Sequence, residues 1–129
     1  MRYIAYGSNM SRKQMAHRCP DAKLIGIGRI DRARLEFYLH ATVEYTRLGA
    51  DSVPVAVWEI SEADERRLDR YEGFPDYYTK RKWTVRMADG SKISGMIYLM
   101  RIIRPQPPTM GYYEGIRDAY RDLGLSSEI

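Results

Sequence analysis

The feature that most constrains the fold lies near the N-terminus, where a short apolar run leads into Tyr6-Gly7-Ser8-Asn9. The run Tyr3-Ile4-Ala5 predicts a strand, and Ser11-Arg12-Lys13-Gln14 predicts the first turn of a helix with a Ser/Gln capping box. A strand, a glycine turn and a helix start leave backbone N–H groups without partners and aimed in one direction. With a helix dipole behind them, such groups form an anion pocket. A plain strand-to-helix turn is the alternative interpretation of the same residues.

In the first interpretation, the loop at residues 6–9 binds a carboxylate or a developing oxyanion. Gly7 lets the backbone come close to the ligand, and Ser8 and Asn9 add side-chain hydrogen-bond donors. Tyr6 is expected to form a wall or scaffold of the site rather than a catalytic group.

The remaining sequence predicts strands with short helices at intervals. Strands are expected over residues 2–5, 23–30, 35–40, 53–60, 77–87 and 91–100, with extended chain over 41–43 and a polar loop over 47–52. Helices are expected over residues 11–18, from Ser61 to Gly73, and from Thr109 or Gly111 to Gly124. This order predicts an α+β fold with a small mixed, barrel-like β-sheet and a few short helices, in a single domain over residues 1–129.

Glycines and prolines add detail to this outline. Gly26 and Gly28 mark a bulge or a close approach within their strand, and Pro54 favours an edge position or a strand start. Ala88-Asp89-Gly90 predicts the turn of a hairpin. A rigid connection to the last helix is predicted from Pro105, Pro107 and Pro108.

Several classes of function are disfavoured by what the sequence lacks. No apolar stretch approaches the length of a membrane span, and no signal-peptide pattern precedes Arg12 and Lys13, so we expect a cytoplasmic protein without a membrane partner. The single cysteine, Cys19, agrees with a reducing compartment. The net charge of +4 comes from scattered basic residues, so nucleic-acid binding is not expected. His17 and His40 match no metal-ligand spacing and are expected as surface or half-buried polar residues, so we expect no metal site and no cofactor.

Glu72 is the residue that conflicts with a local rule. It stands in the last turn of the helix that begins at Ser61, where the dipole is negative and a carboxylate costs stability. Leu68 lies four residues earlier on the same face, so Glu72 points inward if Leu68 packs in the core. Burial and the dipole then both raise the pKa of the carboxyl, which suits a general base near neutral pH. The alternative is that Glu72 frays outward beside Gly73.

The loop at residues 6–9 and the pair Glu72-Gly73 together resemble the γ-glutamylcyclotransferase family, in which such a loop binds a γ-glutamyl group and a Glu-Gly pair supplies the catalytic carboxylate. Further similarity is carried by Ala41-Thr42-Val43, by Tyr77-Tyr78, and by Pro107-Pro108 with Tyr112 and Gly124-Leu125. The resemblance runs through nearly the whole chain and implies the fold of that family. The chain lacks the extended tail of many members, which leaves the identity of the leaving group open.

The resemblance implies that the chain converts a γ-glutamyl amine or peptide, a small-molecule substrate, to 5-oxoproline and a free amine. The α-amine of the substrate attacks its own γ-carbonyl, so no nucleophilic Ser or Cys is needed. In this mechanism Glu72 acts as general acid and base, and the loop amides at Gly7, Ser8 and Asn9 bind the α-carboxylate or the oxyanion. Tyr78 and Tyr112 are implied to line the pocket and donate hydrogen bonds, although Tyr112 also fits the apolar face of the last helix as a core residue.

Other interpretations of the same residues stay open. Arg34, Arg81 and Arg101 could each meet a substrate carboxylate, and their spacing selects none of them. A non-catalytic module that binds a small carboxylate or amino acid in the anion pocket is the alternative function, and a nucleic-acid-binding protein is a third. The sequence does not determine the leaving group, the pathway or the oligomeric state.

Overall fold

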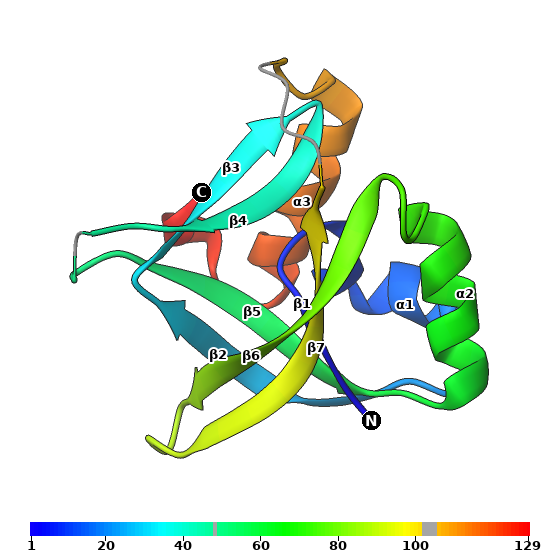
Figure 1. The fold of residues 1–129 in the computed structure, drawn as a ribbon. Helices are drawn as coiled ribbons and strands as arrows, with labels where there is room; N and C mark the ends of the chain where they lie inside the picture. Colours follow the sequence, from blue (N-terminus) through cyan, green and yellow to red (C-terminus); the bar gives the residue numbers. More distant parts are fainter. Residues whose placement is uncertain (48, 102–105) are drawn as a thin grey trace.

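In the computed structural model, which describes residues 1–47, 49–101 and 106–129, five strands close into a barrel in the order β1-β5-β2-β6-β7 (Figure 1). Their bounds are β1 Arg2–Ala5, β2 Lys23–Asp31, β5 Ser52–Glu59, β6 Tyr78–Met87 and β7 Lys92–Met100. Neighbouring strands are antiparallel except β1 and β7, which run parallel. The predicted α+β fold with a barrel-like sheet is confirmed. Pro105 of the predicted connection and residue 48 of the predicted polar loop lie outside the described residues.

A second, two-stranded sheet and three helices surround the barrel. The sheet consists of β3 Ala33–Tyr38 and β4 His40–Tyr45. The helices are α1 Arg12–Arg18, α2 Glu62–Glu72 and α3 Met110–Asp122, with 3-10 turns η1 Ser8–Met10 and η2 Ser126–Glu128. Figure 1 shows α1 and α2 together on one side of the barrel and α3 behind the β3–β4 hairpin, where the rings of Phe37 and Tyr113 lie 5.6 Å apart. Within the described ranges, no helix has both the length and the apolar character that crossing a membrane requires.

Two glycines in β2 allow the barrel to close. The register between β2 and β5 shifts between Leu24 and Gly26, which is a β-bulge. A Cβ on Gly28 would lie 2.3 Å from Cγ1 of Val85 on β6, a distance that no side chain tolerates. The predicted bulge and the predicted close approach are therefore both present.

Pro54 lies where its missing N–H interrupts no ladder between β5 and β1. Pairing of β5 with β1 ends at Ala56, opposite Ala5, two residues beyond the proline. On the other side of β5, Pro54 stands opposite Arg29 of β2. The proline is the third residue of β5, in agreement with the predicted position near a strand start.

The ends of α2 follow the local sequence signals. The Ser61 hydroxyl accepts the Asp64 N–H at 3.1 Å and the Asp64 carboxylate accepts the Ser61 N–H at 3.4 Å, which is a capping box. Gly73 adopts the left-handed conformation at φ +63°, and the N–H of Phe74 bonds to the carbonyl of Asp69 at 2.9 Å. This is a Schellman motif, so the helix ends directly after Glu72.

The predicted capping box of α1 is only half formed. The Ser11 hydroxyl accepts the Gln14 N–H at 3.2 Å as expected. The N–H of Ser11, however, bonds to the carbonyl of Ser8 at 3.1 Å within η1, and the Gln14 side chain accepts from Arg18 instead. The 3-10 turn has therefore taken the backbone donor that Gln14 would have capped.

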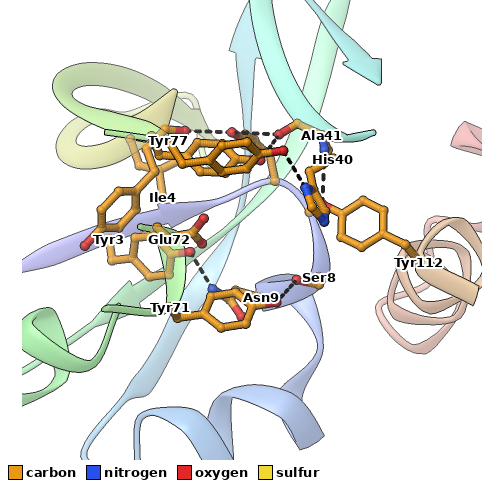
Figure 2. Close-up of a pocket in the computed structure, with 14 residues that line it drawn as sticks. Tyr3, Ile4, Ser8, Asn9, His40, Ala41, Tyr71, Glu72, Tyr77 and Tyr112 are labelled. Carbon is orange, nitrogen blue, oxygen red and sulfur yellow. Dashed lines mark hydrogen bonds between the residues drawn. The ribbon is translucent and has the colours of Figure 1, made fainter. Parts of the chain in front are cut away.

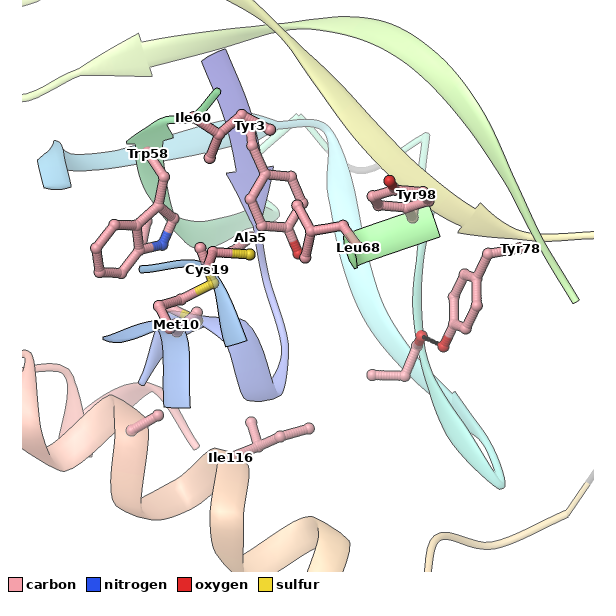
Figure 3. Packing of buried hydrophobic residues seen from close by; sticks show 14 of the residues in the cluster. Tyr3, Ala5, Met10, Cys19, Trp58, Ile60, Leu68, Tyr78, Tyr98 and Ile116 are labelled. Carbon is pink, nitrogen blue, oxygen red and sulfur yellow. Dashed lines mark hydrogen bonds between the residues drawn. The ribbon is translucent and has the colours of Figure 1, made fainter. Parts of the chain in front are cut away.

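Because successive side chains of a strand point to opposite faces of the sheet, the hydrophobic core has two parts. One part fills the barrel with small branched side chains, among them Ile4, Val55, Val57, Val85 and Ile97. The other part lies between the outer face of the barrel and the helices, as Figure 3 shows for Tyr3, Ala5, Met10, Trp58, Leu68 and Ile116. Leu68 is fully buried there, and it fixes the face that α2 turns toward β1 and β7.

Candidate active site

A cavity of about 160 Å³ lies where β1, β4, β7, the end of α2 and the start of α3 meet (Figure 2). It is lined by Tyr3, Ile4, Tyr6, Gly7, Ser8, Asn9, His40, Ala41, Tyr71, Glu72, Tyr77, Tyr78, Tyr98 and Tyr112. The predicted site residues Glu72, Tyr78, Tyr112 and the loop at residues 6–9 are all among them. The volume is below the roughly 300–1,000 Å³ of pockets for drug-sized ligands, so the cavity suits a ligand the size of an amino acid.

Glu72 borders the cavity from the last position of α2. It lies on the same helix face as the buried Leu68, so the carboxyl points inward rather than fraying into solvent. Burial raises the pKa of Glu72 to about 7, while the nearby charge of Arg18 opposes this rise. Glu72 is therefore a group that exchanges a proton near neutral pH.

The loop at residues 6–9 forms a 3-10 turn rather than the start of an α-helix. The turn is closed by bonds from the Met10 N–H to the Gly7 carbonyl at 3.0 Å and from the Ser11 N–H to the Ser8 carbonyl. Since α1 begins only at Arg12, no α-helix dipole stands directly behind these amides, and that part of the prediction is wrong. The N–H groups of Gly7, Ser8 and Asn9 nevertheless precede the first bond of the turn and find no partner within it.

Asn9 is a structural residue as well as a lining residue. It is buried, its Nδ2 donates to the Tyr3 hydroxyl at 2.9 Å, and its Oδ1 accepts from Arg18. Its carbonyl accepts the indole N–H of Trp58 at 3.1 Å. One of the two side-chain N–H donors of Asn9 is therefore engaged with Tyr3, and these bonds fix the loop against β1, β5 and α1.

Three tyrosines hold the backbone of Ala41 on another wall of the cavity. The Tyr78 hydroxyl donates to the Ala41 carbonyl at 2.6 Å, and the Tyr6 hydroxyl donates to the Tyr98 carbonyl at 2.6 Å while lying 3.4 Å from the same Ala41 oxygen. The Tyr112 hydroxyl accepts the Ala41 N–H at 3.1 Å. Tyr78 therefore lines the cavity and donates a hydrogen bond, and the acceptor in this structure is the Ala41 carbonyl. Tyr112 turns its hydroxyl to the cavity rather than serving the core alone, and its proton remains available for donation.

Sequence reasoning missed His40 and Tyr77 as lining residues. Nδ1 of His40 lies 2.6 Å from the Tyr77 hydroxyl, and the imidazole packs edge-on against the rings of Tyr77 and Tyr112. Burial lowers the pKa of His40 below its ordinary value. The available signal was the position of His40 directly before Ala41, in the stretch that resembles the family.

Polar bonds behind the cavity hold α2 against the barrel. The Tyr98 hydroxyl donates to the Asp69 carboxylate at 2.5 Å. The ammonium of Lys80 on β6 lies 2.9 Å from carboxylate oxygens of both Asp69 and Glu65. Because these side chains connect α2 to β6 and β7, they set the position from which Glu72 reaches the cavity.

None of the three arginines considered from the sequence lines the cavity. Arg34 pairs with Asp51 at 3.2 Å, Arg81 bonds to neighbours on its own strand, and Arg101 lies 3.4 Å from the Pro75 carbonyl. Arg18 is the cation that acts on Glu72, and its guanidinium lies 3.5 Å over the ring of Tyr71. In the part of the chain that the structure describes, no group of three or more His, Cys, Asp or Glu side chains is arranged to hold a metal ion.

Comparisons with known proteins agree with this geometry. A family model described as "Gamma-glutamyl cyclotransferase, AIG2-like" matches residues 3–115. A gamma-glutamylcyclotransferase from Bos taurus is 25% identical over 137 residues, which cover 98% of this chain and 73% of the bovine protein. A solved structure of a gamma-glutamyl cyclotransferase matches with a TM-score of 0.88 and 26% identity, over 99% of this chain and 82% of that one. An uncharacterized protein from Homo sapiens matches with a TM-score of 0.87 and 26% identity, over 98% of this chain and 82% of the human one.

The family match extends from β1 into α3, and so includes every segment that contributes to the cavity. The similarity to solved structures extends over the same elements. The chain therefore belongs to the gamma-glutamyl cyclotransferase, AIG2-like family.

Proposed function

We propose that this protein is a γ-glutamylcyclotransferase-like enzyme of the cytoplasm that converts a γ-glutamyl amine or peptide to 5-oxoproline and a free amine. One observation carries the proposal: Glu72, with a pKa of about 7, borders the same small cavity as the amides of Gly7, Ser8 and Asn9. Membership of the family supports the class of reaction. The cavity supplies the two things that this cyclisation needs, a proton acceptor and a place for the substrate's negative charge.

The substrate itself provides the nucleophile in this reaction. Its α-nitrogen attacks the γ-carbonyl carbon, a C–N bond closes the five-membered ring, and the C–N bond to the leaving amine breaks. Holding the γ-glutamyl group in the attacking conformation is worth roughly 7–11 kcal/mol in well-oriented intramolecular reactions. A cavity of about 160 Å³ favours this folded conformation over an extended chain.

Each lining group has a proposed role. Glu72 removes a proton from the α-ammonium and returns one to the leaving nitrogen. The amides at residues 7–9 bind the α-carboxylate or the oxyanion, and one such donor is worth about 3–4 kcal/mol in acyl transfer. Tyr112 donates its free hydroxyl proton to the substrate, whereas Tyr6 and Tyr78 keep the wall at Ala41 rigid.

The test is to incubate the protein with γ-glutamyl dipeptides and γ-glutamyl amines and to measure 5-oxoproline. The Glu72→Gln variant keeps the shape of the side chain but removes the proton acceptor, and we expect it to lose about 10²-fold or more in kcat. Glu114→Gln, the same change at an exposed position of α3, serves as the matched control and keeps full activity. Wild-type activity in Glu72→Gln would remove Glu72 from the mechanism.

The alternative, a module that binds a small carboxylate without chemistry, predicts a different outcome of the same experiment. An acidic amino acid would then bind at equilibrium, and no γ-glutamyl compound would yield 5-oxoproline over days. The raised pKa of Glu72 favours the enzyme, because a module that only binds an anion gains nothing from a half-buried acid beside it.

A further inference from the structure

The proposed cyclisation moves two protons, and one carboxyl carries only one at a time. The α-ammonium of the substrate has three hydrogens on nitrogen, whereas the ring nitrogen of 5-oxoproline keeps one. The leaving nitrogen has one hydrogen in the amide and three in the released alkylammonium. Two protons therefore pass from the first nitrogen to the second, and a second carrier beside Glu72 would let both stay inside the site.

Most hydroxyl groups around the cavity are unsuited to this task. The Tyr6, Tyr78 and Tyr98 hydroxyls donate to fixed acceptors, and burial raises the pKa of Tyr78 and Tyr98 far above neutrality. Among the described lining residues, Glu72 and His40 are the two whose side chains ordinarily titrate below about pH 8. The second carrier is therefore to be sought at His40.

His40 is connected to the cavity through Tyr77. Its Nδ1 lies 2.6 Å from the Tyr77 hydroxyl, a short and well-formed hydrogen bond. Figure 2 shows this pair bordering the same space as the carboxyl of Glu72, and the charge of Glu72 contributes to raising the pKa of Tyr77. Among the residues that the structure describes, the rings packed against His40 are those of Tyr77, which precedes β6, and Tyr112 of α3, both uncharged.

We propose that the Tyr77–His40 pair is the second proton carrier of the cyclisation, with Tyr77 as the relay and His40 as the store. This rests on the proposed function. The Tyr77 oxygen accepts a proton from the substrate nitrogen as its own proton passes to Nδ1 of His40, which becomes an imidazolium. When the C–N bond to the leaving amine breaks, the same two transfers run backwards and deliver the proton to the leaving nitrogen. Protons and charge balance without any further reactant.

The resting state of His40 suits this role. Burial lowers its pKa, so the imidazole is neutral at pH 7 and Nδ1 has a lone pair for the Tyr77 proton. The edge-on contacts with Tyr77 and Tyr112 hold the ring in place, so the relay needs no rearrangement of the side chain. An imidazolium formed there is the less stable form, which favours return of the proton.

The test compares two substrates that differ in how many protons the leaving group takes up. A γ-glutamyl alkylamide releases a basic amine that takes up two protons. γ-Glutamyl-4-nitroanilide releases a weakly basic aniline that takes up one, so the second proton of its α-ammonium passes to solvent and need not be stored and returned. The His40→Asn variant keeps a hydrogen-bond partner for Tyr77 but cannot be protonated. We expect it to lose about 10²-fold in kcat on the alkylamide and at most about threefold on the nitroanilide, with KM unchanged on both.

The Tyr77→Phe variant is the second arm, and it should reproduce this selective loss because it removes the relay but keeps the ring. Equal losses on both substrates, or no loss on either, would mean that His40 only supports the cavity wall, and the relay would be refuted while the proposed function stood. Wild-type turnover of the nitroanilide alone would also refute the relay. Absence of 5-oxoproline from both substrates with the wild-type protein would refute the proposed function, and the relay with it.

Discussion

Replacing Glu72 by Gln should stabilise this protein at alkaline pH. The pKa of Glu72 is raised from its ordinary 4.5 to about 7, so the folded state holds the proton more tightly than the unfolded chain does. Between these two values, a rise in pH favours the unfolded state, because only there does the carboxyl ionise freely. Each pKa unit corresponds to about 1.4 kcal/mol, so wild-type protein at pH 8 carries a penalty of about 3 kcal/mol that a neutral amide lacks.

The measurement is urea denaturation of wild type and Glu72→Gln from pH 4.5 to pH 8, followed by the fluorescence of the two tryptophans, Trp58 and Trp83. The two proteins should differ by less than about 0.5 kcal/mol at pH 4.5, where the Glu72 carboxyl is protonated in the folded state and about half ionised in the unfolded chain. The variant should become the more stable one as the pH rises, by about 3 kcal/mol at pH 8. Groups common to both proteins cancel in the difference.

The matched control is Glu114→Gln, an exposed position of α3 beyond the first turn of the helix, where the difference from wild type should stay flat across this range. A Glu72→Gln variant with the same pH dependence as wild type would show that the carboxyl is not held in its neutral form. Glu72 would then not be an acid and base tuned to neutral pH, whatever an assay of activity showed.

Three further substitutions test the packing that positions the site, each by urea denaturation at pH 6. Gly28→Ala should destabilise the barrel by more than about 2 kcal/mol, since its Cβ would lie 2.3 Å from Val85 Cγ1, and an unchanged midpoint would contradict the close approach of β2 and β6. Gly73→Ala should lower the free energy of unfolding by about 1–2 kcal/mol, because Gly73 adopts φ +63°. It should also lower activity by displacing Glu72, and a stabilised variant would rule out the Schellman turn. Leu68→Ala should cost about 2–5 kcal/mol as a fully buried residue, whereas a loss below about 0.5 kcal/mol would place α2 elsewhere.

The sequence predicted those features of the site that depend on neighbours along the chain. The four-residue spacing of Leu68 and Glu72 put both side chains on one helix face, so the burial of Leu68 decides that the Glu72 carboxyl borders the cavity. Gly26 and Gly28 likewise predicted a bulge and a close approach within one strand. Such features depend on residues that are near one another in the sequence and belong to one helix or strand.

The features that the sequence did not predict depend on contacts between distant segments. The proton of Tyr78 goes to the carbonyl of Ala41, a partner that exists only once β4 lies against β7 and β6. Arg18 has a local reason to stand in the last turn of α1, so nothing in the sequence pointed to its effect on Glu72. His40 is an ordinary polar residue at the start of a strand until tertiary folding brings Tyr77 to its ring.

The barrel closes through a short pairing of β1 with β7, next to the candidate site. Within the described residues, β1 meets β7 through one bridge pair, Tyr3 opposite Met96, whereas its pairing with β5 runs over four residues. β1 is also the strand that leads directly into the 3-10 turn, so transient parting of β1 from β7 would shift the amides of Gly7 and Ser8 relative to Glu72. A substrate that contacts both the amides at residues 7 and 8 and the Glu72 carboxyl would hold β1 against β7. Amide hydrogen exchange along β1 should therefore slow when the cavity is filled.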